Sequence, residues 1–297
     1  MEKKKRLSRF KRMSGPGLAF RLQERDMEII KLVYAYRLLT SRLIQLLASG
    51  SAQGILRRLQ LLFHHGYLER VSTWQPGSLV YALGNKGADV LAVNFGFDRG
   101  RVDWRKKNKE ISTYFVYHSL MISNFRATLE LASRSHRELK LLNWTGEGEI
   151  KESVHIDVSM RPGQGRKERI PIVPDGFFSL EDPEDLAYQL DFFLEADRST
   201  MTNERFLNKM RAYWSYWKEI KSGKRQGPEA FRVLTITKTE ARKENLRRIT
   251  QKADDYQKGS PMFYFTSENH YSPGSPESVL QTIWQTPVDE SRHSLLE

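Results

Sequence analysis

The sequence predicts an α+β protein in which an N-terminal winged helix-turn-helix is followed by an α/β domain with a mixed sheet. Three amphipathic helical segments come first, and two strand-like segments around a turn follow them. In the remainder of the chain, strand-like segments precede and separate two further helices, an order typical of a mixed sheet. The 297 residues suffice for two such domains, each with a core of its own.

Changes in composition divide the chain into five stretches. The segment DRGRVDWRKKNK has no apolar periodicity, so it marks the boundary between the two domains. The stretches are a basic flexible tail (1–21), the winged helix-turn-helix (22–97), a charged linker (98–109), the α/β domain (110–265) and a flexible C-terminal end (266–297).

The first domain begins with three helices, two of which have a clear capping residue. We expect the first at Glu24–Tyr36 and the second at Ser41–Leu47, after the cap Thr40. The third helix begins after the cap Ser51 and stops at Gly66. Its apolar residues form one stripe that we expect to be buried: Ile55, Leu56, Leu59, Leu62 and Phe63.

A hairpin follows these helices and completes the winged-helix order. Its strands are expected at Tyr67–Val71 and Leu79–Leu83, on either side of a turn that contains Pro76 and Gly77. Trp74 and Gln75 would lie at the tip of this wing and contact DNA.

Polar side chains form a row on the face of the third helix opposite its apolar stripe. Gln53, Arg57, Gln60 and His64 follow one another at spacings of four, three and four residues. An arginine can pair with two acceptors of guanine and a glutamine with adenine, so we expect this row to read bases in the major groove. Arg58 flanks the row and suits a phosphate contact.

The charge of the chain favours an anionic polymer as its partner. The formal net charge is +12, and the first 21 residues hold eight Lys and Arg against a single Glu. Such a tail can follow phosphates of double-stranded DNA, although it could also serve only solubility. The tail residues predicted to contact DNA are Lys3, Lys4, Lys5 and Arg6.

Composition also excludes several classes of protein. The sequence has no cysteine, so it has no disulfide, thiolate zinc site or cysteine nucleophile. It has no apolar run long enough to cross a membrane, and its basic N-terminus lacks the apolar stretch of a signal peptide. We therefore expect a cytoplasmic protein without a membrane partner.

The second domain is expected to be an α/β sandwich with a mixed sheet. A long amphipathic helix from Ile111 to Ser133 opens it. Later helices at Asn203–Ile220 and Glu240–Asp254 lie on either side of a strand at Phe231–Thr237. The other strands are expected at Leu139–Trp144, Val154–Val158, Gly176–Leu180, Tyr188–Ala196 and Met262–Phe265.

Acidic residues gather at the ends of two of these strands. Glu195 and Asp197 are two positions apart on one strand, so both side chains emerge on the same face. Asp175 begins a neighbouring strand, and Lys209 lies in the following helix. Three carboxylates at one edge suit Mg²⁺ or Mn²⁺, which can activate water against a phosphodiester. Purely structural pairing with nearby Lys and Arg side chains is an equal alternative.

The motifs of this region resemble one known family. Asp175 lies in PDG, Glu195 in the strand end FFLEADR, and Lys209 and Tyr213 in the helix after it. Together with FRVLTITKTEARKENLRRI, their order and spacing resemble the replication-relaxation family of plasmid and mobile-element proteins, over residues 22–265.

This resemblance implies that the second domain is similar to the PD-(D/E)xK nuclease superfamily. Asp175 and Glu195 would match its two metal-binding carboxylates. The nuclease pattern has a lysine two residues after the second carboxylate, where this sequence has Asp197. The resemblance therefore implies cleavage only if Lys209 supplies the lysine from the helix.

Three functions are compatible with these observations. The first is a DNA-binding factor in plasmid or mobile-element replication or transfer, whose second domain holds DNA or a partner. The second is a metal-dependent DNA endonuclease or nickase that uses Asp175, Glu195, Asp197 and Lys209. The third is a docking module for replication or relaxase proteins. A homodimer on two half-sites would suit the first function.

Overall fold

The structure is a computed structural model in which two compact units, Met1–Ala127 and Thr128–Glu297, can be distinguished. We call them unit 1 and unit 2. Residues whose structure is described are 10–13, 20–73, 77–99, 112–136, 139–157, 167–181 and 189–297.

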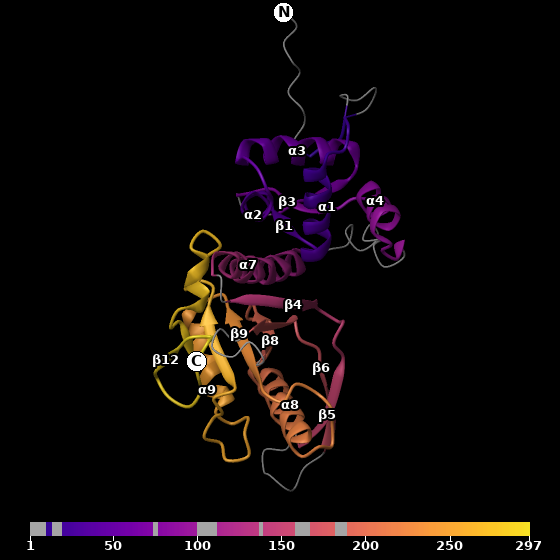
Figure 1. The fold of residues 1–297 in the computed structure, drawn as a ribbon. Helices are drawn as coiled ribbons and strands as arrows, with labels where there is room; N and C mark the ends of the chain where they lie inside the picture. Colours follow the sequence, from indigo (N-terminus) through magenta and orange to yellow (C-terminus); the bar gives the residue numbers. More distant parts are fainter. Residues whose placement is uncertain are drawn as a thin grey trace, which may run out of the picture. The chain divides into compact units, whose positions relative to one another are not determined.

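Unit 1 begins with three helices whose bounds agree with the prediction (Figure 1). Ser51 caps the third helix because its hydroxyl accepts a hydrogen bond from the backbone N–H of Gly54 at 3.2 Å. Gly66 ends that helix with a φ of 85°, a left-handed conformation that glycine adopts without strain. The helices are α1 (Glu24–Tyr36), α2 (Ser41–Leu47) and α3 (Ala52–His65).

A three-stranded antiparallel sheet completes the expected hairpin. The predicted strands pair with each other, and Leu68 lies opposite Leu83. A third strand, between α1 and α2, pairs with the second strand of the hairpin and is too short to show a pattern in the sequence. The strands are β1 (Leu39–Thr40), β2 (Leu68–Val71) and β3 (Val80–Leu83), in the order β1-β3-β2.

A helix that the sequence analysis did not predict, α4 (Asn85–Phe95), follows β3. Its buried face consists of Gly87, Ala88 and Leu91, which make a short and weakly apolar stripe. Gly87 allows a close approach, because a Cβ there would lie 2.4 Å from the carbonyl oxygen of Tyr67. Because two of these three buried residues are small, the apolar periodicity of the helix is too weak to predict it from the sequence.

The long helix α7 (Thr113–Ser135) contributes residues to both units. In unit 1, Val116 joins the buried cluster that contains Leu38 and Val80. Ser123 Oγ donates a hydrogen bond to the carbonyl oxygen of Leu38 at 2.8 Å. The division between the units thus falls inside this helix, whereas the sequence analysis placed the boundary in the linker at 98–109.

Among the described residues, unit 2 is built on a seven-stranded mixed sheet with the order β12-β11-β10-β9-β8-β7-β4. Figure 1 labels its strands β4, β8, β9 and β12. Strands β8, β9 and β10 are parallel, and the other neighbours are antiparallel. The strands are β4 (Lys140–Gly146), β7 (Gly176–Glu181), β8 (Gln189–Asp197), β9 (Phe231–Thr237), β10 (Phe263–Ser267), β11 (Trp284–Gln285) and β12 (Arg292–His293).

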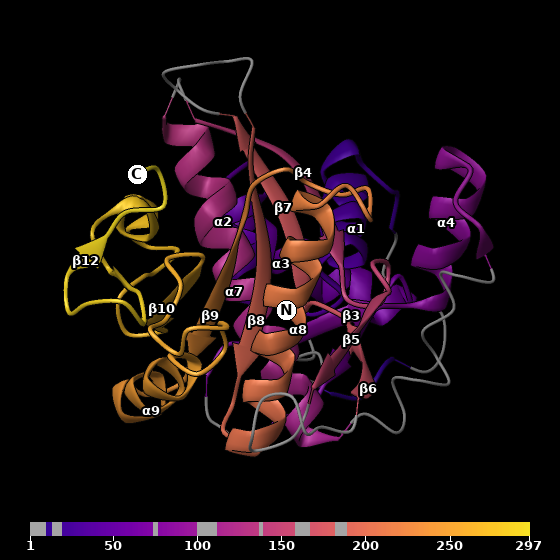
Figure 2. The ribbon, with the colours of Figure 1, turned by 90° about the horizontal axis from the view of Figure 1, so that it is seen from below.

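Two helices connect the parallel strands. Helix α8 (Asn203–Lys221) joins β8 to β9, and α9 (Glu240–Thr250) joins β9 to β10. Figure 2 shows α8 lying in front of β8. Because the carboxyl ends of parallel strands meet at one edge, the last residues of β8, β9 and β10 and the first turns of both helices come together there.

The core of unit 2 lies around α8. Phe206, Met210 and Tyr213 of this helix pack with Phe193 of β8 and Phe263 of β10. On another side, α8 contacts an antiparallel hairpin whose buried residues belong to the same cluster. The hairpin consists of β5 (Glu152–Asp157) and β6 (Lys167–Ile172).

Strand β6 was not predicted, because three charged residues and Pro171 leave little apolar pattern in it.

The C-terminal end differs from the expectation. Residues 266–297 were expected to be flexible, yet they add β11 and β12 to the sheet. Trp284 is fully buried, and its indole N–H donates to the carbonyl oxygen of Val279 at 3.1 Å. Burial of this large apolar side chain orders a segment whose composition is mostly polar.

None of the helices in the described part of the chain combines the length and hydrophobicity that a membrane crossing requires.

Candidate functional site

The exposed face of α3 carries polar side chains that the described part of the chain leaves without partners. Gln53 and Arg57 are exposed and Gln60 is half-buried. Within the described residues, none of these three side chains has a hydrogen bond or ion pair. Leu56 lies beside them and is 46 % exposed, so it does not belong to the buried stripe in which the sequence analysis placed it. It follows Ile55 by about 100° around the helix, which carries it past the edge of the apolar face.

Arg58, predicted to contact phosphate, is instead engaged inside unit 1. Its Nε donates to Oδ1 of Asp26 at 2.7 Å, and its Nη2 donates to Oδ2 of the same residue. Nη2 also donates to the carbonyl oxygen of Arg21 at 3.1 Å. Asp26 is fully buried in α1, and a buried carboxylate requires a partner. Arg58 therefore links α3 to α1 within unit 1.

His64, predicted as the last member of the row, is buried and only 9 % exposed. Two arginines lie against this last turn of α3. Arg12 Nε donates to the carbonyl oxygen of Phe63 at 3.0 Å, and the Arg70 guanidinium lies 4.2 Å from the centre of the Phe63 ring. Burial lowers the pKa of His64, and the charge of Arg70 lowers it further. The row of accessible polar side chains therefore ends at Gln60.

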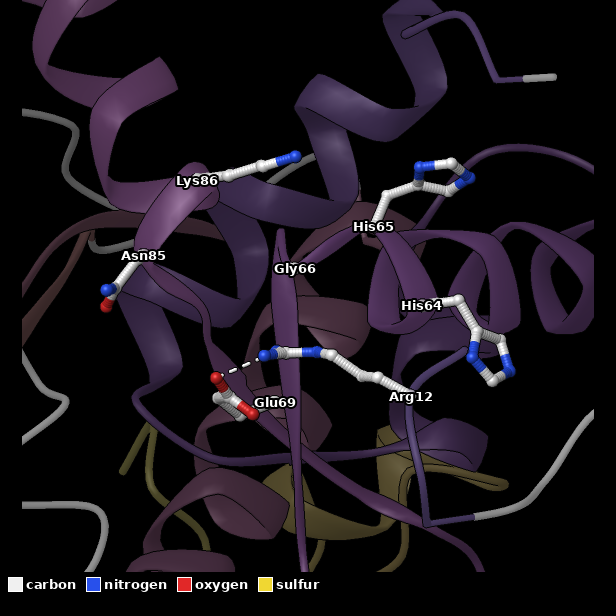
Figure 3. A pocket seen from close by; sticks show the side chains of 7 residues that line it. All are labelled: Arg12, His64, His65, Gly66, Glu69, Asn85 and Lys86. Carbon is white, nitrogen blue, oxygen red and sulfur yellow. Dashed lines mark ion pairs between the residues drawn. The ribbon is translucent and has the colours of Figure 1, made fainter. Parts of the chain in front are cut away.

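Arg12 also takes part in a pocket of about 230 Å³ beside the end of α3 (Figure 3). Its guanidinium forms an ion pair with Glu69 at 2.8 Å and donates to the carbonyl oxygen of Leu68 at 3.1 Å. Arg12 thus anchors the segment before α1 to strand β2. The remaining residues predicted to contact DNA lie outside the described residues: Lys3, Lys4, Lys5, Arg6, Trp74 and Gln75.

In unit 2, Glu195 of β8 lies at the centre of a buried polar cluster. Lys209 Nζ donates to Glu195 Oε2 and to the carbonyl oxygen of Val173, the latter at 3.1 Å. The hydroxyl of Tyr213 donates to Glu195 Oε1 at 2.6 Å. Lys209 and Tyr213 are four residues apart on α8, so both face the same strand. We call Asp175, Glu195, Lys209 and Tyr213 the Glu195 cluster.

Burial controls the electrostatics of the Glu195 cluster. It raises the pKa of Glu195 to about 7, and the Lys209 ammonium limits this rise. Burial alone would lower the pKa of Lys209, but the charges of Glu195 and Asp175 outweigh it and raise that pKa. Burial and the neighbouring Glu195 raise the pKa of Tyr213 well above its usual value. Lys209 therefore stays an ammonium and Tyr213 stays a neutral donor.

Asp175 lies beside Glu195 in the turn before β7. Its Oδ2 accepts a hydrogen bond from the backbone N–H of Ala196 at 2.7 Å. The next residue must be small, because a Cβ at Gly176 would lie 2.7 Å from the indole ring of Trp144. The PDG motif therefore places the carboxylate of Asp175 next to β8, and the glycine that follows it fits against Trp144 where a larger residue would not.

Asp197, although on the same strand as Glu195, belongs to a separate ion pair. Arg242 Nε donates to its Oδ1 at 2.8 Å, and Arg242 Nη2 donates to its Oδ2 at 3.0 Å. Arg242 also donates to the carbonyl oxygen of Met201 at 2.7 Å, so it ties β8, α9 and the loop before α8 together. Arg242 was not among the residues predicted for the site. Its position in the first turn of α9, the helix after β9, was the available signal, because β8 and β9 are parallel.

The carboxylates as arranged do not fit a divalent metal ion. Both oxygens of Glu195 and of Asp197 accept hydrogen bonds from the protein, and so does one oxygen of Asp175. Within the described ranges, no group of three Asp, Glu or His side chains could hold a metal ion. The expected three-carboxylate site is therefore divided: Glu195 pairs with Lys209, and Asp197 pairs with Arg242.

A comparison with known proteins adds the family. The family described as Replication-relaxation matches residues 30–229, more than half of the chain. The matched region contains α3, Asp175, Glu195 and Lys209. No curated protein and no solved structure matches the chain. The chain belongs to the replication-relaxation family.

Proposed function

We propose that this protein acts in replication by binding double-stranded DNA with the exposed face of α3. Membership of the replication-relaxation family suggests a role in replication. Unit 1 has the element order of a winged helix-turn-helix, with α3 in the position of the recognition helix and β2–β3 as the wing. In such domains the recognition helix enters the major groove, where base edges are accessible.

The free polar groups on α3 carry this proposal. Arg57 has a guanidinium without a partner among the described residues, and it can donate two hydrogen bonds to guanine. The side-chain amides of Gln53 and Gln60 form no hydrogen bond within the described part of the chain, and they can pair with adenine. Leu56 lies beside them and can contact the methyl group of thymine.

The charge of the chain supports DNA as the partner. A formal net charge of +12 favours association with phosphates. By contrast, Arg12, Arg58 and Arg242 form ion pairs within the protein, so they do not contribute free charge. We therefore expect salt-dependent binding to which Arg57 and the basic residues of the tail contribute.

We assign unit 2 a holding role, on DNA or on a protein partner, in plasmid or mobile-element replication or transfer. A second candidate function is DNA cleavage, which is favoured by the meeting of Asp175, Glu195 and Lys209 at one edge of the sheet. Cleavage with a metal ion would require these carboxylates to give up the donors that they now have. The holding role needs no such change.

Binding of the full chain to a pool of random-sequence duplexes, followed by sequencing of the bound fraction, tests the proposal. Fluorescence anisotropy on the enriched duplex then compares the wild type with Arg57→Ala and Arg57→Lys across a salt series. We expect Arg57→Ala to weaken binding by about tenfold or more. Arg57→Lys keeps the charge but loses the two-donor geometry, so it should lose sequence preference while it keeps most of its salt dependence.

Negligible binding at low salt would exclude DNA as the partner and favour the docking function. Equal binding by the wild type and Arg57→Ala would show that α3 does not enter the groove. Nicking of supercoiled plasmid in Mg²⁺, abolished by Asp175→Ala, would favour the endonuclease.

A further inference from the structure

The ammonium group of Lys209 occupies a position with the ligands of a metal site. Around it are a carboxylate oxygen of Glu195 and the carbonyl oxygen of Val173, and the charge of Asp175 acts on it as well. Carboxylate and carbonyl oxygens are the ligands that hard divalent cations prefer. A lysine has three N–H donors and no acceptor, so it satisfies the same oxygens as a cation would.

We infer that Lys209 serves as the resident cation of the Glu195 cluster, so that this cluster binds no Mg²⁺ or Mn²⁺ while the lysine is present. This inference goes beyond the proposed function and does not depend on DNA binding by α3. The family resemblance implies a metal site at Asp175 and Glu195. The carboxylate of Glu195 is instead engaged by Lys209 and Tyr213, and the inference follows from this difference.

Packing of α8 holds the lysine in place. Phe206, Met210 and Tyr213, which lie three residues before, one after and four after Lys209, are at most 2 % exposed. The helix therefore cannot rotate to withdraw the ammonium without exposing its core residues. The Lys209 side chain itself is 17 % exposed, and that of Glu195 is 6 % exposed.

Tyr213 closes the other side of the Glu195 carboxylate. Its hydroxyl donates to Oε1 at 2.6 Å, while Lys209 donates to Oε2, so each oxygen already has a buried donor that an added ion would have to share or displace. Asp197 cannot replace Glu195 as a ligand, because Arg242 engages both of its oxygens. An added divalent ion would have to displace a buried ammonium from a buried carboxylate, which is unfavourable.

Removal of the ammonium reverses this balance. In Lys209→Ala, Glu195 would remain buried without a counter-charge, and the space of the lysine side chain would be open beside the carbonyl oxygen of Val173. A buried unpaired carboxylate either takes up a proton or binds a cation. With Asp175 nearby, we expect the variant to bind Mn²⁺ that the wild type does not bind.

Titration of the full chain with MnCl₂, followed by the electron paramagnetic resonance signal of free Mn²⁺, tests this inference. Thermal unfolding with and without Mn²⁺ is the second measurement. We expect no Mn²⁺ uptake by the wild type that depends on Glu195. Lys209→Ala should bind Mn²⁺ at least about tenfold more tightly than the wild type and should gain thermal stability from it. The added substitution Glu195→Gln should abolish both effects.

Two further variants serve as controls. Lys218→Ala removes a lysine of the same helix whose ion pair with Asp255 is exposed, so it should behave as the wild type does. Lys209→Met preserves most of the side-chain volume and replaces Lys209→Ala if the smaller residue prevents folding. Uptake of Mn²⁺ by the wild type that is lost in Glu195→Gln would overturn the inference. So would a folded Lys209 variant that binds no more Mn²⁺ than the wild type.

Discussion

Arg58 of α3 and Asp26 of α1 form a two-point ion pair in which the carboxylate is fully buried. The neighbouring Arg57 is exposed and has no partner among the described residues. Two consecutive arginines therefore have opposite roles, since one fastens two helices of the unit and the other faces solvent. This difference allows stability and DNA binding to be separated experimentally.

Arg58→Ala should reduce the free energy of unfolding by about 3–5 kcal/mol, because it leaves the charge of Asp26 buried and unpaired. Arg57→Ala should change it by about 0.5 kcal/mol or less, since Arg57 makes no such contact with any described residue. Urea unfolding followed by circular dichroism measures both. Equal effects of the two substitutions would contradict the assignment of their roles.

Leu56→Ala should weaken binding to duplex DNA with little loss of stability. The side chain is 46 % exposed, so its truncation should cost about 1 kcal/mol or less on unfolding. Leu59→Ala is the matched control, since Leu59 is fully buried on the same helix and its truncation should cost about 2–5 kcal/mol. Anisotropy on the enriched duplex, together with urea unfolding, distinguishes a base contact from a core contact.

Tyr213→Phe should destabilise unit 2 by about 1–3 kcal/mol, because it removes the hydroxyl that donates to the buried Glu195. Tyr216→Phe, on the same helix, should have a smaller effect because its hydroxyl has no hydrogen-bond partner among the described residues. Chemical unfolding of both variants gives the comparison. A larger effect at Tyr216 would contradict the hydrogen-bond network of the Glu195 cluster.

Glu240 should make stability depend on acid pH. Burial alone would raise its pKa, but hydrogen bonds from Lys243 and Ser267 outweigh burial and lower the pKa to about 2 from the usual 4.5. Its contribution is therefore complete above pH 4.5 and is lost as the pH falls toward 2. Because the side chain is about half exposed, this contribution should be about 1 kcal/mol or less.

In Glu240→Gln the melting temperature should consequently fall less between pH 4.5 and 2 than it does in the wild type. Glu277→Gln is a suitable control, because Glu277 is exposed and has no hydrogen bond or ion pair in the described structure. Identical pH profiles for the wild type and Glu240→Gln would mean that the contacts of Glu240 contribute nothing.

Trp284→Ala should destabilise unit 2 by about 3–5 kcal/mol, because it leaves a cavity in the place of a fully buried side chain. Phe97→Ala, in unit 1, is a control in which the aromatic side chain is 37 % exposed. Thermal unfolding with proteolysis of residues 266–297 measures the effect. A variant as stable as the wild type would restore the expectation of a flexible end.

Sequence pattern alone is sufficient for the elements of this protein whose signals are local. The bounds of α1, α2 and α3 follow from caps and apolar periodicity within a few residues of each helix end. Strand β9 is likewise bounded as predicted. The approach of Asp175 to Glu195 could also be anticipated, because both lie at the ends of neighbouring strands.

Partners that come from distant segments depend on the tertiary structure. Arg58 pairs with Asp26, Arg242 with Asp197 and Lys209 with Glu195, at sequence separations of 32, 45 and 14 residues. No periodicity encodes these choices, since each is set by which charged groups a packed core leaves near one buried carboxylate. The burial of His64 and the ordering of residues 266–297 have the same origin. Local pattern therefore determines the elements, while long-range packing determines which charges remain free to bind a ligand.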